Sequence, residues 1–86
     1  MPNEASTLDH FLMGELGTIT AIDTDIDLRQ RLAALGLREG SVLQVLRKAG
    51  FGGPIQVRVG TTEVIMRLCD AKRIKTMPMV NRLAVP

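Results

Sequence analysis

The sequence predicts a mainly β domain, a small barrel of about five strands with one inserted short α-helix. Short runs of aliphatic and β-branched residues recur along the 86 residues, and glycine-containing turns separate them. One leucine stripe at helical spacing interrupts these runs. Trp and Tyr are absent and Phe occurs only twice, so we expect an aliphatic core. Closing short strands into a barrel removes exposed edges, which would otherwise promote aggregation.

The N-terminal part is expected to contribute one helical turn and the first strand. Residues 1–7 are polar and predict a flexible N-terminus. Leu8, Phe11 and Leu12 follow at helical spacing, which indicates a short turn that ends at Gly14. The partly alternating stretch Gly17–Asp23 is the first predicted strand.

The clearest helix signal is the stretch "DIDLRQRLAALGL". Its apolar stripe consists of Leu28, Leu32 and Leu35. We expect Asp27 to cap the N-terminus, with Gln30 three residues later completing a capping box. At the other end Gly36 suits the left-handed residue that closes a helix, and Leu37 can fold back onto the last turn as in a Schellman motif.

The second half of the chain predicts the remaining strands. These are "SVLQVLRK" (41–48), "PIQVRV" (54–59), "EVIMRL" (63–68) and "IKTM" (74–77). "GTT" is a hairpin turn between two of them, and "CDAKR" is a single helical turn capped by Asp70. Residues 78–86 form a C-terminal tail outside this pattern. The predicted core is Ile19, Ile22, Leu32, Leu35, Val45, Ile55, Val57, Val59, Val64, Met66 and Ile74.

Charge and cysteine content narrow the function classes. The net charge is +2 and the basic residues are spread along the chain, so an anionic partner is favoured but not required. Cys69 is the single cysteine, which fits a reducing compartment. The N-terminus lacks the features of a secretory leader, and no stretch is apolar enough to span a bilayer. We therefore expect a cytoplasmic protein that does not insert into membranes.

Metal binding and catalysis find little support in the sequence. The two weak candidate ligands are His10 and Cys69, which stand beside Asp9 and Asp70 without the spacing of a known metal motif. The simpler interpretation makes His10 a surface residue and Cys69 a small buried one. No pairing of a nucleophile with a base is evident, so we expect neither an enzyme nor a bound cofactor.

The stretch "GFGGP" (50–54) between two predicted strands is the main candidate site. One interpretation is a wide turn, in which glycines permit backbone angles closed to other residues. The other is a docking loop, in which Phe51, Gly52 and Gly53 form a contact surface and Arg47 and Lys48 steer an acidic partner. A phosphate-binding loop is not expected, because the segment leads into a strand.

The stretches "RLAALGLREG", "GGPIQVRVG" and "IMRLCDAKRI", in this order, resemble the FeoA family, the small cytosolic partner of the bacterial ferrous iron transporter FeoB. The resemblance covers residues 8–77 and implies a single SH3-like barrel domain. It also implies docking on the cytosolic domain of a FeoB-type transporter, for which we predict contacts from Phe51, Gly52, Gly53, Arg47, Lys48 and, on the helix, Arg31. Association with Fe²⁺ and homo-oligomerisation stay open.

Two alternative functions stay open as well. The same domain occurs at the C-terminus of DtxR-type metal-dependent repressors, which suggests a metal-responsive regulatory domain. A basic small barrel can also bind nucleic acid, although two Phe residues are a poor stacking platform and we do not expect it.

Overall fold

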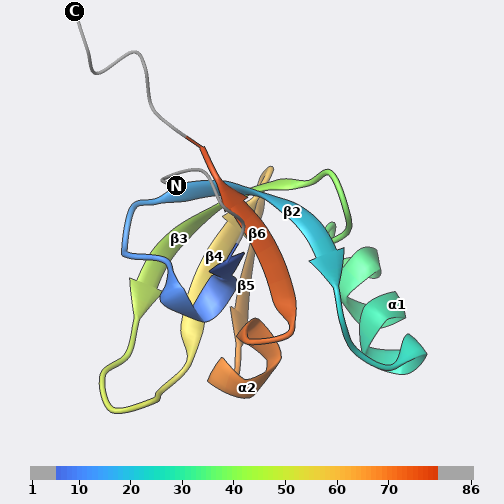
Figure 1. The fold of residues 1–86 in the computed structure, drawn as a ribbon. Coiled ribbons are helices and arrows are strands. Elements are labelled where there is room, and N and C mark those ends of the chain that lie inside the picture. Colours follow the sequence, from blue (N-terminus) through green and yellow to red (C-terminus); the bar gives the residue numbers. More distant parts are fainter. Residues whose placement is uncertain (1–5, 80–86) are drawn as a thin grey trace, which may run out of the picture.

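Six strands form one antiparallel sheet in the computed structural model, which describes residues 6–79 (Figure 1). The spatial order of the strands is β1-β6-β2-β3-β4-β5, so β3, β4 and β5 follow one another as hairpins and β6 returns to lie between β1 and β2. The strands are β1 (Ser6–Thr7), β2 (Leu16–Ile22), β3 (Val42–Lys48), β4 (Ile55–Val59), β5 (Thr62–Met66) and β6 (Ile74–Pro78). The mainly β fold class with an inserted α-helix is confirmed, with one short strand more than predicted.

Two irregularities curve the sheet around its core. The β2–β6 register shifts between Ile19 and Ala21, and the β3–β4 register shifts between Val45 and Arg47. An extra residue in one strand bends it and increases its twist. The sheet therefore wraps around one interior, as the crossing of β2 and β6 over β4 and β5 shows in Figure 1.

The core is aliphatic, as predicted, with one aromatic ring. The buried hydrophobic residues are Leu8, Phe11, Ile19, Ile22, Leu32, Leu37, Leu43, Val45, Ile55, Val57, Val64, Met66, Ala71 and Ile74. Phe11 packs on Gly17, where an added Cβ would lie 2.6 Å from the ring and 2.5 Å from Thr76 Cγ2. Burying a side chain of this size contributes about 1.5–3 kcal/mol. The short helix η1 (Leu8–His10) and Phe11 are therefore part of the fold.

The position of helix α1 (Ile26–Ala34) is predicted correctly, but the prediction of its N-cap residue is wrong. Asp25, not Asp27, caps it: the Asp25 carboxylate accepts from Leu28 N at 2.8 Å. Asp25 has the extended backbone of a cap, whereas Asp27 already lies in the first helical turn.

The C-terminus of α1 closes as the sequence predicts. Gly36 has a φ of 97°, its N–H donates to Ala33 O at 2.9 Å, and Leu37 N–H donates to Leu32 O at 2.8 Å. These are the two bonds of a Schellman motif. Leu37 thereby enters the core, and the prediction that Leu35 lies there is wrong, because this C-cap residue is 44% exposed. Val59, another predicted core residue, is only partly buried.

At the N-terminal end of the described residues the structure differs from the prediction. Ser6 and Thr7, inside the predicted flexible segment, form β1 and pair with Thr76 and Lys75 of β6. At the C-terminal side Pro78 ends β6. The rest of both predicted terminal segments, 1–5 and 80–86, lies outside the described residues.

Helix α2 (Leu68–Ala71) is the predicted single turn, but Asp70 does not cap it. Arg67 occupies the N-cap position, and its side chain makes no capping bond to the backbone of the helix. The Asp70 carboxylate instead accepts a hydrogen bond from Arg67 Nε at 3.3 Å. Within residues 6–79, neither helix has the length and apolar character that crossing a membrane requires.

Candidate partner-binding site

The segment between β3 and β4 is a tight hairpin with Phe51 at its tip. Ala49 N–H donates to Pro54 O at 3.0 Å and Gly53 N–H donates to Gly50 O at 3.2 Å. The two central residues both have positive φ, 58° at Phe51 and 75° at Gly52. Positive φ at both centres defines a type I′ turn, whose twist matches the flanking strands. The predicted wide turn is therefore a two-residue hairpin connection.

Phe51 contributes nothing visible to the stability of this turn. Its side chain is fully exposed, and it is the one residue other than glycine with positive φ among residues 6–79. A left-handed backbone costs an ordinary L-residue about 1–2 kcal/mol. Leaving a phenylalanine side chain in water forgoes a further ~1.5–3 kcal/mol that burial would supply. The backbone term favours Asn, Asp or Gly at this position, and the exposed ring adds no stability in return, so the fold does not require a phenylalanine there.

The glycines beside Phe51 give the turn its shape. A Cβ at Gly53 would lie 2.6 Å from Ala49 Cβ, so only glycine fits there without a shift. A Cβ at Gly52 would lie 4.0 Å from Leu68 Cδ2, which places the hairpin tip beside the start of α2. Hairpin geometry thus accounts for Gly52 and Gly53, whereas it requires neither Gly50 nor Phe51.

The three predicted basic contact residues lie in different settings. Arg47 is exposed on β3 beside the hairpin. Lys48 is occupied within the fold, because its Nζ donates to Asp9 O at 2.8 Å and to Phe11 O at 2.9 Å. Arg31 is exposed on α1, which Figure 1 shows on the opposite side of α2 from the β3–β4 hairpin. The structure brings Arg47 close to the hairpin and leaves Arg31 apart from it.

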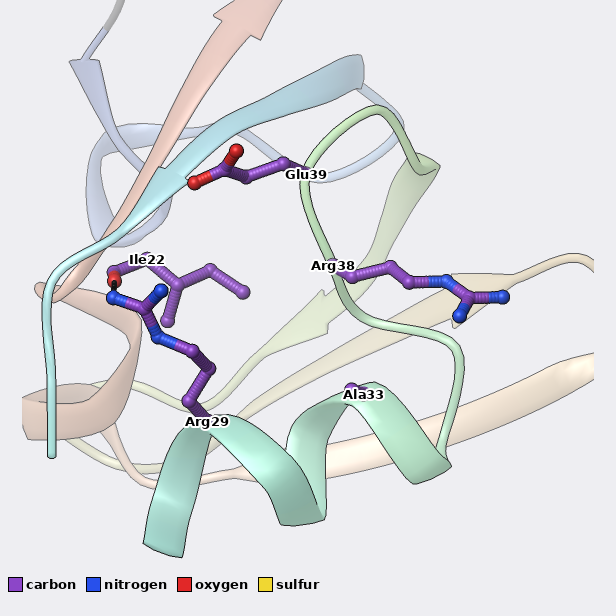
Figure 2. Close-up of a pocket in the computed structure, with 5 residues that line it drawn as sticks. All are labelled: Ile22, Arg29, Ala33, Arg38 and Glu39. Carbon is purple, nitrogen blue, oxygen red and sulfur yellow. Dashed lines mark hydrogen bonds between the residues drawn. The ribbon is translucent and has the colours of Figure 1, made fainter. Parts of the chain in front are cut away.

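Away from the hairpin, a hollow of about 350 Å³ lies between α1 and β2 (Figure 2). It is lined by Ile22, Arg29, Ala33, Arg38 and Glu39. Arg29 reaches across it and donates to Ile22 O at 2.8 Å, while Figure 2 shows Arg38 pointing away from the cleft. Because the Arg29 guanidinium ties the helix to β2, this hollow has a structural role and shows no set of converging reactive groups.

The two weak metal candidates lie apart from any ligand cluster. His10 is exposed as predicted, with its Nδ1 3.2 Å from Thr7 Oγ1 and its Nε2 3.9 Å from Asp9 Oδ2. Cys69 is exposed, so the prediction that it is buried is wrong. Helix α2 is a single turn, and Cys69 lies on its outer side while Ala71 faces the core. Among residues 6–79 no three His, Cys, Asp or Glu side chains gather as a metal site.

Arg67 and Asp70, which stand on either side of Cys69 in the sequence, form an ion pair. The hydrogen bond from Arg67 to Asp70, supported by the charge of that carboxylate, raises the pKa of the Arg67 guanidinium above its ordinary value. Arg67 therefore carries a full charge at any physiological pH.

Ile65 is the surface residue that sequence reasoning overlooked. It is 68% exposed on β5, between the inward-facing Val64 and Met66. It lines a hollow of about 240 Å³ together with Arg47 and, on its other side, a groove of about 410 Å³ together with Arg31. The alternation in "EVIMR" already placed this isoleucine on the outer face, which was the available signal.

The curved antiparallel sheet, with a helix inserted between β2 and β3 and a single helical turn before β6, defines a small SH3-like β domain. The family model for the FeoA domain matches residues 6–78. The chain therefore belongs to the FeoA family, which confirms the resemblance and the predicted fold. No curated protein matches the chain.

Solved structures agree with this assignment. The chain is similar to the solution NMR structure of FeoA protein from Chlorobium tepidum, with a TM-score of 0.81 and 31% identity over 86% of this chain and 70% of that one. It is also similar to a crystal structure of the iron uptake regulatory protein FeoA, with a TM-score of 0.79 and 26% identity over 88% of this chain and 99% of that one.

A structure of a manganese-dependent transcriptional repressor is similar as well, with a TM-score of 0.80 and 26% identity over 90% of this chain. The match spans 43% of the repressor, so the likeness concerns one part of that longer protein.

Proposed function

We propose that this chain is a small accessory protein of bacterial ferrous iron uptake, which docks on the cytosolic domain of a FeoB-type transporter and modulates it. Membership of the FeoA family supports the link to ferrous iron transport. In this proposal the protein acts from the cytoplasm by binding and not by catalysis. Its contact surface is centred on the tip of the β3–β4 hairpin.

The observation that carries the proposal is the setting of Phe51. A fully exposed aromatic side chain on a left-handed backbone has a conformational cost in the free protein and no gain from burial to offset it. Burial of the ring by a partner would supply that gain, and phenylalanine is enriched in the buried core of protein interfaces. Arg47 beside the hairpin adds a charge that favours an acidic partner surface.

The test is a pull-down of this chain with the soluble domain of the transporter, with and without guanine nucleotide. Wild type should be retained, and Phe51→Ala should be retained far less while its circular dichroism spectrum and melting curve stay those of a folded domain. Ile26→Ala is the matched control, because Ile26 is also an exposed hydrophobic residue, on the far side of the molecule in α1. Equal retention of wild type and Phe51→Ala would reject the hairpin as the contact site.

A metal-responsive regulatory role is the second candidate, and one observation favours it. The manganese-dependent repressor structure contains a region of this fold with 26% identity. If this chain regulates transcription, it must bind DNA or a DNA-binding partner. A gel shift of labelled DNA at low salt tests the first possibility, and the absence of any shift with or without Mn²⁺ or Fe²⁺ would dispose of it.

A further inference from the structure

Strand β5 forms one edge of the sheet, and its outer backbone groups have no partner among residues 6–79. The Val59↔Thr62 pair closes a two-residue connection, so the pairs that exchange hydrogen bonds are Val59–Thr62, Val57–Val64 and Ile55–Met66. The N–H and C=O groups of Glu63 and Ile65 consequently point away from β4. Within residues 6–79 no further strand follows β5 in the sheet, and no loop or side chain bonds to these amides.

The β5 edge also lacks the features that usually protect such edges. It has no proline, no lysine and no register shift along its pairing with β4. The opposite edge strand, β1, has only two residues and both are polar. Glu63 is the one charged residue in β5, and Arg58 and Gln56 bind its carboxylate at 3.1 and 2.9 Å. The β5 edge therefore offers an open backbone ladder to another extended segment.

An apolar groove runs along this edge. Its volume is about 410 Å³, and it separates β5 from helix α1. Leu28 of α1 and the C-cap residue Leu35 line one wall, and Ile65 and Met66 of β5 line the other. Leu35 and Ile65 are exposed at the opening of the groove. Alternate side chains of an added strand would reach apolar surface here, while its backbone pairs with Glu63 and Ile65.

The charges around the groove select the kind of segment that fits. Arg31 lies on the α1 wall and Arg47 lies in the adjoining hollow beyond Ile65. The acidic side chains of β5 and α2 are already paired, Glu63 with Arg58 and Asp70 with Arg67. No ion pair involves Arg31 or Arg47 among the described residues, and the carboxylate of Asp27 lines a separate hollow on the other side of Arg31. Of the charged residues that line the groove itself, Arg31 is the one without an ion-pair partner among the described residues.

We propose that the β5 edge binds an extended peptide segment of a partner protein by strand addition, and that this segment has aliphatic residues at alternate positions and glutamate or aspartate between them. The backbone groups of Glu63 and Ile65 form the ladder, the groove takes the aliphatic side chains, and Arg31 receives a carboxylate. This surface is separate from Phe51 and does not depend on the proposed role of the hairpin.

The probe is the blocked peptide acetyl-Thr-Val-Glu-Val-Glu-Val-Thr-amide, titrated into the ¹⁵N-labelled full chain and followed by NMR. The Glu63 and Ile65 amides should shift most and should exchange more slowly with solvent. The analogue with Lys at both Glu positions should bind about tenfold more weakly, since a like charge then faces Arg31. No shift at β5 with millimolar peptide, or equal binding of both peptides, would overturn the proposal.

Four variants separate strand addition at β5 from peptide binding elsewhere on the domain. Ile65→Glu places a negative charge beside the acidic peptide on an exposed edge position and should weaken binding about tenfold or more without unfolding the domain. Leu12→Glu, at an equally exposed residue before β2, should bind as wild type. Arg31→Ala should reduce the preference for the Glu peptide over the Lys peptide. Phe51→Asn should bind the peptide normally, so failure of the hairpin proposal and failure of this one give different results.

A second copy of the chain is the competing occupant of the β5 edge. If sedimentation shows a dimer that Ile65→Glu dissociates, and the peptide produces no shift in the monomeric range of concentration, then β5 pairs with itself and the peptide proposal is wrong.

Discussion

The two neighbouring hairpins of the sheet, β3–β4 and β4–β5, both begin their turns with a residue of positive φ, but their turn types and residues differ. Phe51 and Gly60 occupy the first central position of their turns, and their φ values are 58° and 60°. In the β4–β5 hairpin the second central residue, Thr61, lacks positive φ, which indicates a type II′ turn, and the first position holds the glycine that this turn type requires. In the type I′ turn of the β3–β4 hairpin the first position holds a phenylalanine whose side chain meets solvent, although Asn, Asp or Gly is preferred there.

The difference between the two turns distinguishes turn residues that the fold requires from a residue that it only accommodates. Gly52 and Gly53 shape the β3–β4 turn, and a glycine or asparagine in place of Phe51 would complete it at lower cost. At the base of the same hairpin, Lys48 bonds to two backbone carbonyls and belongs to the fold. The hairpin thus has a structural base and a tip whose aromatic residue the fold does not require.

The largest stability effect is expected at the base of the hairpin. Lys48→Met leaves the carbonyl groups of Asp9 and Phe11 without their donor, and bonds to a charged group contribute about 1.5–3 kcal/mol. Urea unfolding should show a loss in this range. Arg47→Met, at the exposed neighbour, should change stability by less than about 0.5 kcal/mol. Equal losses for the two variants would show that Lys48 has no special structural role.

The next effect puts the residue of one turn into the other. Gly60→Phe puts a side chain on the first central position of a type II′ turn, where φ is 60°, and should cost at least about 1–2 kcal/mol. For a domain of this size each kcal/mol lowers the melting temperature by about 4–8 °C, so differential scanning calorimetry resolves it. Thr61→Phe, at the adjacent exposed residue without positive φ, should cost clearly less. A similar loss at both positions would contradict the assignment of the cost to backbone conformation.

A smaller loss is expected from Gly53→Ala. The new Cβ would meet Ala49 Cβ at 2.6 Å, and relieving that overlap near a hairpin tip should cost about 1 kcal/mol. Gly50→Ala is the matched control, because a Cβ at Gly50 has nothing within 4 Å. Thermal unfolding of both variants tests the difference, and an equal loss would mean that hairpin packing does not determine the glycine at position 53.

The smallest expected effect on stability has the opposite sign. Phe51→Asn should stabilise the domain by about 0.5 kcal/mol, because asparagine tolerates left-handed geometry and no buried contact is lost. Urea unfolding measures it against wild type. A loss of more than about 1 kcal/mol would show that the Phe51 ring packs against the domain after all.

Much of the fold follows from local sequence pattern, since alternation places Ile55, Val57 and Val64 inside and the Gly36–Leu37 pair ends α1. The errors occur where tertiary structure decides between similar local options. Asp25 and Asp27 are both suitable caps, and the point at which the chain leaves β2 selects the first. The sequence spacing places Leu35 on the apolar stripe of the helix, but the helix has already ended at Ala34. Local pattern does not contain this information.

In the candidate site, too, some features follow from local sequence pattern and others depend on tertiary structure. Phe51 could be singled out because glycines flank a rare aromatic residue, although its left-handed backbone could not be foreseen from a residue that seldom adopts it. The bonds of Lys48 join residues 37 and 39 positions apart, so no local signal announces them. Cys69 was misplaced because a four-residue helix offers no periodicity from which to judge the buried side.

Isothermal titration of the FeoB-type soluble domain with wild type and Phe51→Asn, alongside their unfolding curves, tests the division between base and tip most directly. The account predicts that the variant is at least as stable as wild type and binds about 30-fold more weakly, which corresponds to about 2 kcal/mol. A variant that binds as tightly as wild type, or one that loses affinity only because it has lost its fold, would contradict it.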